Sequence, residues 1–155
     1  MKTKLAFRHK KDEIKGPYRY TACGLDNVYL LNGYELYQLE DGEGVSVQDL
    51  EDLHRAIGRC LAKQDEPLQP KELRWFRLHL DWTQDKLAET LECTPEAVTQ
   101  WEKGECSPSE KNDMFIRLLY LDYIADGAGF QTLLERLRQP ASHPPTSWMM
   151  DQAAT

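Results

Sequence analysis

Residues 83–104 read TQDKLAETLECTPEAVTQWEKG and predict two short helices joined by a tight turn. Thr83 and Thr94 each stand at the start of a helix, where a hydroxyl accepts a hydrogen bond from a backbone amide that has no partner within the helix. Pro95 suits the first turn of the second helix, because its missing N–H is not needed there. Gly104 suits the end of that helix, where the chain adopts the left-handed conformation.

The apolar residues of this stretch recur at helical spacing, so each helix has one inward side. Leu87 and Ala88 form that side of the first helix, and the small Ala88 allows the two helices to cross closely. Val98 and Trp101 form that side of the second. A preceding helix over about 71–80 and a following helix capped by Ser109 complete a group of four. Their predicted inward residues are Leu73, Phe76 and Leu80, completed by Trp75 or Leu78, and then Ile116, Leu119 and Tyr123.

This succession of caps, apolar positions and turns resembles the helix-turn-helix of repressors of the lambda Cro and Xre type. The resemblance implies that the second helix of the motif lies in the major groove of DNA, with its N-terminal half against the bases. One residue departs from the family pattern, since Glu92 stands where relatives usually have a glycine in the turn. A non-glycine residue there must hold a costly left-handed conformation or shift the turn.

The residues predicted to contact DNA lie mainly on the side of the second helix that faces away from Val98 and Trp101. Gln100 can bond bidentately to adenine, Glu96 can accept a hydrogen bond from cytosine N4, and Thr99 can reach a base or a thymine methyl group. Helix N-termini and lysines supply phosphate contacts. The full predicted set is Gln84, Thr94, Pro95, Glu96, Thr99, Gln100, Lys103 and Lys111. The alternatives are that Glu96 only stabilises the helix N-terminus and that Lys103 is a solvated cap residue.

The N-terminal half alternates aromatic or apolar residues with polar ones, a pattern typical of strands. Asn32-Gly33 is typical of a two-residue hairpin turn, because both central positions of that turn need positive φ. We therefore predict a small antiparallel meander, whose tyrosines either pack beneath it or form an aromatic binding surface. The predicted strands cover residues 18–21, 28–31, 34–39 and 45–47.

The predicted fold class is α+β, with a small N-terminal β-meander plus a helix followed by a mostly helical Cro/Xre-like helix-turn-helix domain. The helix after the meander is opened by Ser46, or by Gln48-Asp49, and runs to Lys63. The predicted domains are a β-rich unit for dimerisation or partner binding, a DNA-binding domain with a further C-terminal helix, and a proline-rich disordered tail. Their boundaries are 1–66, 67–139 and 140–155.

The block at residues 24–34, GLDNVYLLNGY, is similar to a segment of regulators grouped with the MqsA-type antitoxins. In that family a zinc-binding N-terminal domain binds a ribonuclease toxin, while the C-terminal domain dimerises and binds the operator. The resemblance implies a toxin partner as an alternative role. The present chain lacks the paired zinc cysteines, because no two of its four cysteines form a C-x-x-C pair. We expect free thiols, no metal and no cofactor.

The net charge of −7 argues against a nonspecific nucleic-acid coat protein, which would be strongly basic. Residues 1–20 nevertheless carry seven Lys/Arg and two Asp/Glu, while residues 21–69 carry three and ten. The basic arm is either a solvated terminus, a phosphate-contacting tail or a complement to the acidic segment that follows.

The sequence shows no pattern of catalytic or phosphate-binding residues, so we do not expect an enzyme. It also lacks a secretory signal and an apolar run long enough to span a membrane, and we expect a cytoplasmic protein. One helix-turn-helix reads about one half-site, so a homodimer on a palindromic stretch of double-stranded DNA is predicted. The surface predicted to join the two protomers consists of Leu118, Leu119, Leu121, Tyr123 and Ile124, with Phe130, Leu133 and Leu137 of a last helix.

Overall fold

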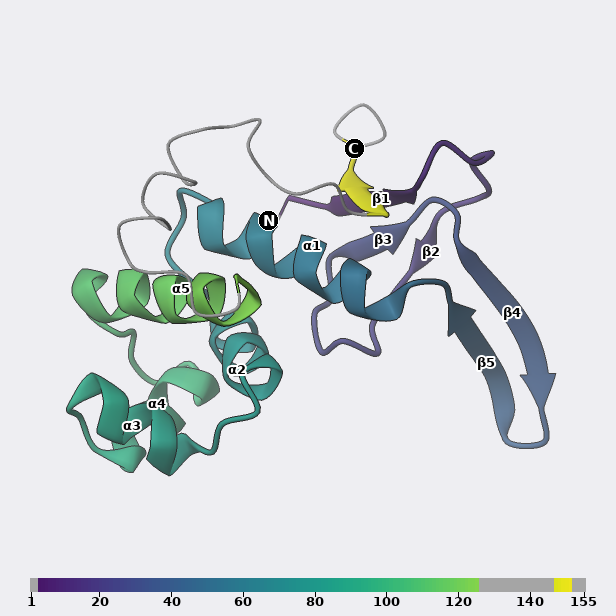
Figure 1. Ribbon diagram of the computed structural model, residues 1–155. Helices are drawn as coiled ribbons and strands as arrows, with labels where there is room; N and C mark the ends of the chain where they lie inside the picture. The colour runs from purple at the N-terminus through teal and green to yellow at the C-terminus, as the bar shows by residue number, and fades with distance from the viewer. Residues whose placement is uncertain (1–2, 126–146, 152–155) are drawn as a thin grey trace. The chain divides into compact units, whose positions relative to one another are not determined.

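The computed structural model describes residues 3–125 and 147–151 (Figure 1). The chain divides into two compact units, of which the first comprises Met1–Ile57 together with Pro145–Thr155 and the second comprises Gly58–Pro144. The observed elements confirm the α+β class, because strands precede the helices of the DNA-binding region. The last predicted helix, at residues 130–137, lies outside the described residues.

The first unit contains a four-stranded mixed sheet in the order β2-β3-β1-β6. Its strands are β1 (Leu5–His9), β2 (Tyr18–Arg19), β3 (Val28–Leu30) and β6 (Trp148–Met150). β1 runs parallel to β3 and antiparallel to β6, and β2 runs antiparallel to β3. The fully buried side chains of this unit include Phe7, Leu25, Val28, Leu30, Leu53, Ile57 and Trp148.

Two expectations about the chain ends are therefore corrected. The solvated-terminus alternative is wrong for residues 5–9, since β1 lies inside the sheet and buries Ala6, Phe7 and His9. The disorder predicted for residues 140–155 is wrong for Trp148–Met150, which pair with β1 in the register Phe7↔Met150. The physical reason is burial, because the Trp148 ring is almost completely removed from water.

The predicted meander is also corrected, because the strands on either side of Asn32-Gly33 belong to different sheets. β4 (Tyr34–Leu39) pairs only with β5 (Gly42–Val47), in a separate two-stranded antiparallel sheet. The Asn32 side chain is buried and accepts a hydrogen bond from the His9 amide at 2.6 Å. Gly33 has φ 72°, and a Cβ there would lie 2.7 Å from the Trp148 ring. The pair connects two sheets instead of forming a hairpin turn.

Helix α1 (Leu50–Lys63) ends at the predicted residue and begins later than Ser46. Ser46 belongs to β5, where it pairs with Glu35. Asp49 then has φ 47°, a left-handed conformation that separates the strand from the helix.

The second unit is helical, with α2 (Pro70–His79), α3 (Gln84–Leu91), α4 (Pro95–Lys103) and α5 (Glu110–Ile124). The Ser109 hydroxyl caps α5 by accepting from the Asn112 amide. Trp75, not Leu78, completes the inward side of α2. The inward prediction for Tyr123 is wrong, since that side chain is exposed. The buried core of this unit includes Leu73, Trp75, Phe76, Leu80, Leu87, Ala88, Val98, Trp101, Ile116 and Tyr120.

Tyr120 takes the inward place predicted for Tyr123, because Gly58 leaves room for it. A Cβ at Gly58 would lie 2.2 Å from the Tyr120 ring. The Tyr120 ring meets the rings of Trp75 and Phe76 edge-on, at centroid distances of 5.4 and 5.1 Å. These aromatic contacts tie α5 to α2, the helix that precedes the helix-turn-helix pair.

Candidate nucleic-acid interface

Helices α3 and α4 begin at the residues that the capping pattern predicts. The Thr83 hydroxyl accepts a hydrogen bond from the Lys86 amide at 3.1 Å, and the Thr94 hydroxyl accepts one from the Ala97 amide at 3.2 Å. Gly104 follows α4 in the left-handed conformation, with φ 81°. These caps fix where α4 starts and stops, and they therefore fix which of its side chains face water.

The turn between α3 and α4 holds Glu92 in the left-handed conformation, with φ 57° and ψ 44°. The strained backbone predicted for a non-glycine residue at this position is thus observed. The Cys93 amide still donates to the carbonyl of Ala88 at 2.9 Å, so the strain does not disturb the end of α3. Burial of the small Ala88 agrees with a close approach of the two helices.

The outward face of α4 carries three polar side chains at helical spacing. Val98 and Trp101 are buried, whereas Glu96, Gln100 and Lys103 are exposed. Residues separated by three or four positions lie on the same face of a helix. The structure therefore brings these three predicted DNA contacts together on one exposed side of α4.

A partly buried ion pair that the sequence analysis missed joins α2 to α4. The Arg77 guanidinium donates through Nε to Glu102 Oε2 at 2.7 Å and through Nη2 to Oε1 at 2.9 Å. The two side chains are 11% and 7% exposed, so water weakens this pair little. Arg77 also donates to the backbone carbonyl of Trp82, just before α3. The only sequence feature that points to this ion pair is the carboxylate of Glu102, directly after the inward-facing Trp101.

This pair continues into two of the predicted contact residues. Gln84 Nε2 donates to Glu102 Oε1 at 3.3 Å, and Gln84 Oε1 accepts from the Thr99 hydroxyl at 2.8 Å. The Thr99 hydroxyl also lies 3.1 Å from the Pro95 carbonyl. A hydroxyl has only one hydrogen to donate, and Gln84 Oε1 is the nearer of these two acceptors. When the Thr99 hydroxyl donates to Gln84 Oε1, it helps to orient the Gln84 side chain.

The remaining predicted contacts lie at different places. Thr94 is exposed at the start of α4, and Pro95 follows it half-buried. Lys111 is exposed in the first turn of α5, not on α3 or α4. The Cys106 thiol lies 3.6 Å from Gln100 Oε1, a contact that the sequence did not predict.

The helix-turn-helix is acidic as well as basic at its surface. Glu89 and Glu92 are exposed close to the turn, while Lys86 lies over the Trp82 ring at 5.7 Å from its centroid. Desolvation by burial raises the pKa of the Cys93 thiol in the turn, which keeps this group uncharged at neutral pH. Acidic and basic side chains are therefore interspersed at the exposed surface of the helix-turn-helix.

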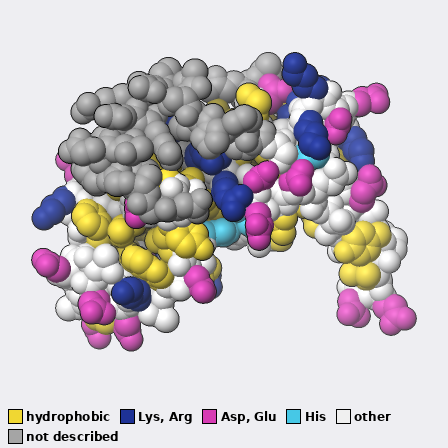
Figure 2. Space-filling view, in the orientation of Figure 1, with side chains coloured by type: hydrophobic (Ala, Val, Ile, Leu, Met, Phe, Trp, Pro, Cys, Tyr) yellow, Lys and Arg dark blue, Asp and Glu magenta, His cyan; other side chains and the backbone are white. Residues whose placement is uncertain are grey.

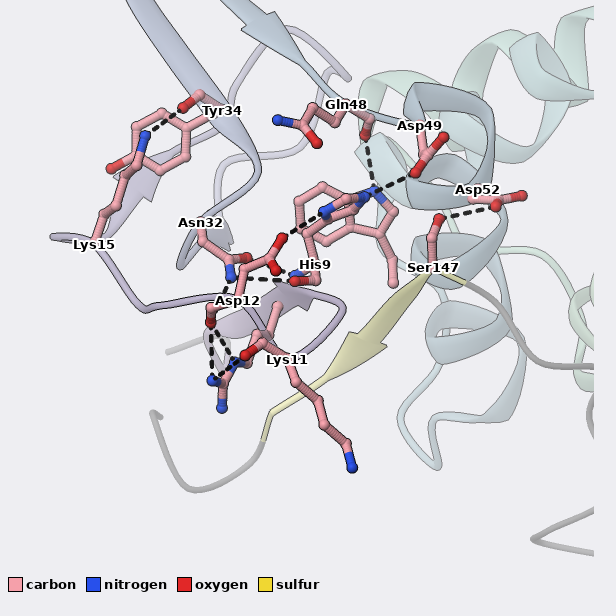
Figure 3. Close-up of polar contacts among 12 residues, drawn as sticks. His9, Lys11, Asp12, Lys15, Asn32, Tyr34, Gln48, Asp49, Asp52 and Ser147 are labelled. Carbon is pink, nitrogen blue, oxygen red and sulfur yellow. Dashed lines mark hydrogen bonds and ion pairs between the residues drawn. The ribbon is translucent and has the colours of Figure 1, made fainter.

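The first unit holds a separate polar cluster around His9 (Figure 3). His9 Nε2 lies 2.8 Å from Asp49 Oδ2, and its Nδ1 lies 3.6 Å from Asp12 Oδ2. The hydrogen bond with His9 is the main reason that the pKa of Asp49 is lowered. The His9 ring also lies 4.9 Å from that of Trp148, whose Nε1 donates to the carbonyl of Gln48 at 3.0 Å. This cluster anchors β6 to β1.

Neither a metal site nor a membrane span emerges from the described residues. In residues 3–125 and 147–151, no three His, Cys, Asp or Glu side chains are arranged to hold a metal ion. No helix in the same part of the chain is long and apolar enough to cross a membrane.

Comparison with protein-family models matches residues 73–112 to the helix-turn-helix family. The match begins in α2, includes all of α3 and α4, and ends in the first turn of α5. No curated protein and no solved structure matches the chain, so the similarity to MqsA-type antitoxins stays a prediction. Residues 73–112 form a Cro/Xre-type helix-turn-helix, the DNA-binding domain of a transcription regulator.

Proposed function

We propose that this chain is a sequence-specific repressor that binds a palindromic operator as a homodimer, with α4 in the major groove. The observation that carries the proposal is the outward face of α4, where Glu96, Gln100 and Lys103 are exposed together above the buried Val98 and Trp101. A major groove about 12 Å wide admits one α-helix, and a helix in it presents such a face to the base edges.

The proposed base contacts come from two residues of α4. Gln100 donates to and accepts from adenine through its amide, and Glu96 accepts a hydrogen bond from cytosine N4. The Thr99 methyl group is the part of that residue left for a thymine methyl, because its hydroxyl is held by Gln84.

The proposed phosphate contacts surround these base contacts. Lys103 and Lys111 are exposed cations, while Gln84 and Thr94 lie at the N-termini of α3 and α4, where helix dipoles favour anions. Gln84 enters the interface already oriented by Glu102 and Thr99, which reduces the entropy lost on binding.

The acidic character of the region makes base contacts more important than usual. Residues 70–125 carry seven Lys/Arg and eleven Asp/Glu, a net charge of −4. General attraction to the phosphate backbone is correspondingly weak, so nonspecific affinity is low. Since one helix-turn-helix reads one half-site, a dimer supplies the remaining affinity.

Selection of bound fragments from a random DNA pool tests this proposal. The purified chain is expected to enrich one palindromic motif whose half-sites lie about 10 base pairs apart, or a multiple of that spacing. A Glu105→Ala variant, altered at an exposed position beyond α4, serves as the matched control and is expected to enrich the same motif. Enrichment of no motif would overturn the proposal.

A second candidate function is that of an antitoxin, which binds a toxin protein through its N-terminal unit and represses its own operon. What supports it is that this unit has a hydrophobic core of its own, separate from the helix-turn-helix. Co-purification with the product of an adjacent small reading frame tests this candidate. Absence of any such neighbouring frame would count against it.

A further inference from the structure

The C-terminal strand β6 lies beside β1 as a bound peptide lies along the edge of a sheet (Figure 1). The two strands are antiparallel, and main-chain hydrogen bonds continue the pairing beyond both ends of β6. The Lys10 amide donates to the Ser147 carbonyl at 2.9 Å, and the Asp151 amide donates to the Ala6 carbonyl at 2.9 Å. Addition of an extended segment to a sheet edge is a recurring mode of peptide recognition.

The place of this segment in the sequence also separates it from the rest of its unit. The first unit is otherwise formed by Met1–Ile57, and the whole second unit, Gly58–Pro144, comes before the chain returns to it. The strands β2, β3 and β1 pair with one another independently of β6, and they contribute the buried Phe7 and Leu30. The unit therefore has a sheet and a core to which the segment is added.

One side chain anchors the segment in a pocket. Trp148 is 1% exposed, whereas its neighbour Met149 is 71% exposed. An extended peptide on a sheet edge alternates in this way, with specificity coming from the side chains that enter pockets. The Trp148 ring lies 4.9 Å from the His9 ring, and a Cβ at Gly33 would approach it to 2.7 Å. Glycine at position 33 therefore leaves room for the indole.

Two acceptors of the first unit bind the polar atoms of the segment. The Gln48 carbonyl accepts a hydrogen bond from Trp148 Nε1 at 3.0 Å. Asp52 Oδ2 accepts one from the Ser147 hydroxyl at 2.9 Å, and Figure 3 shows these two side chains pointing toward one another. Arg55 donates to the other Asp52 oxygen at 3.0 Å and so orients the carboxylate. Phenylalanine in place of Trp148 would fill the pocket without the first of these bonds.

Asn32, in the block at residues 24–34, leaves the outer edge of β1 available for this pairing. Its Oδ1 accepts from the His9 amide at 2.6 Å, and its Nδ2 donates to the His9 carbonyl at 3.2 Å. Because successive main-chain groups of a strand point to opposite edges, Lys10 then faces the other side, where Ser147 lies. The same block supplies the glycine of the pocket.

The β4–β5 hairpin is another apolar surface of this unit. Figure 2 shows hydrophobic side chains along it and acidic ones at its tip. Leu36, Tyr37 and Leu39 are exposed there. The edge of β1 differs because the structure supplies its occupant, and the chemistry of that occupant defines a ligand.

We propose that the edge of β1 is a peptide-binding groove for extended segments that contain a Ser-Trp pair, and that the chain's own Ser147–Met150 fills it in cis. The partner that this groove fits is a protein that presents such a segment and displaces β6. The groove lies within the first unit, so the proposal does not depend on the operator binding proposed above.

Binding of a synthetic peptide to the full-length protein tests this groove. The probe is a fluorescently labelled peptide of residues 145–152, PTSWMMDQ, and anisotropy measures its binding. Trp148→Ala removes the anchor of the chain's own segment and is expected to bind the probe at least about tenfold more tightly than the parent, in which that segment competes within the same molecule. A control peptide with alanine in place of its tryptophan is expected to bind neither protein.

The contact between Ser147 and Asp52 gives a second readout that a merely structural strand would not show. A peptide with alanine in place of its serine is expected to bind Trp148→Ala roughly fivefold more weakly than the probe, because it cannot donate to the carboxylate. In the double variant W148A/D52A the two peptides are expected to bind equally. Unequal binding there would show that the serine does not contact Asp52.

The test also holds if Trp148→Ala loses the fold of the first unit. The probe is then expected to restore the hydrogen-exchange protection of β1, since a ligand of the folded state stabilises it, and the control peptide is not. The groove would be overturned by a folded variant that does not bind the probe, by an unfolded variant that the probe does not restore, or by equal binding of probe and control peptide.

The cis occupancy has its own test. Arg8 faces Met149 in the strand pairing, so oxidation of an R8C/M149C variant is expected to form a disulfide within one chain. R8C alone is the matched control and is expected to form none at this position. A disulfide that joins two chains would show that a second copy fills the groove, and it would overturn the cis assignment.

Discussion

At the scale of single residues, Gln100 and Lys103 are neighbours on the exposed face of α4 but are expected to differ in what they contact. Gln100→Ala is expected to cost about 1–3 kcal/mol on the selected operator and to relax preference at one base position. Lys103→Ala is expected to weaken binding to selected and scrambled DNA alike. It is also expected to reduce the slope of log binding constant against log salt concentration by about one unit. Both variants are compared on both duplexes across a salt series. If Gln100→Ala lowers the affinity for both duplexes by the same factor, α4 does not read bases.

His79 gives the second unit a predictable dependence on pH. Its ring stacks on Trp75 at 3.8 Å, and burial lowers the pKa of the imidazole below its usual 6.5. The folded state therefore favours the neutral ring, and protonation favours the unfolded chain. The resulting stability is present above about pH 6.5 and is lost as pH falls through the lowered folded pKa.

Urea unfolding of the parent and of His79→Gln at pH 7.5 and pH 5.5 measures this effect. The free energy of unfolding is expected to fall more in the parent than in the variant on acidification. Identical losses in both proteins would show that the imidazole does not carry the effect.

At the scale of elements, the turn between α3 and α4 contains a removable strain. Glu92 occupies the left-handed region, which costs a residue with a Cβ roughly 1–2 kcal/mol. Glu92→Gly is expected to raise the free energy of unfolding by about 0.5–1 kcal/mol, because the added flexibility of glycine in the unfolded chain offsets part of the gain. Glu92→Ala removes the carboxylate and keeps the Cβ, so it should give no such gain. Equal stabilisation by both would point to charge instead of backbone strain.

The helices of the second unit could be predicted from sequence because their signals are local. Thr83, Thr94 and Ser109 cap their helices as the pattern indicates, and Gly104 ends α4. The outward face of α4 follows from the same periodicity. The Arg77–Glu102 pair joins residues 25 apart, and no local pattern distinguishes that partner from other acidic residues. Its effect on Gln84 and Thr99 was missed for this reason.

At the scale of the whole molecule, the sheet of the first unit depends on contacts that no local pattern contains. Arg8 pairs with Met149 from the opposite end of the sequence, and β1 pairs in parallel with β3. The hairpin turn predicted at Asn32-Gly33 requires positive φ at both residues, but only Gly33 has it, and the Asn32 side chain instead accepts a hydrogen bond from the His9 amide of β1. The positions of β2, β3, β4 and β5 were therefore predictable from local alternation, whereas β1, β6 and their partners in the sheet were not.

The central claim is that two copies of this chain place α4 on the two halves of one operator. Light scattering of the complex with the selected DNA, together with hydroxyl-radical footprinting, tests it most directly. The account predicts two chains per duplex and two protected half-sites on one face, about 34–36 Å apart or a multiple of that distance. One chain on a single asymmetric site would contradict it.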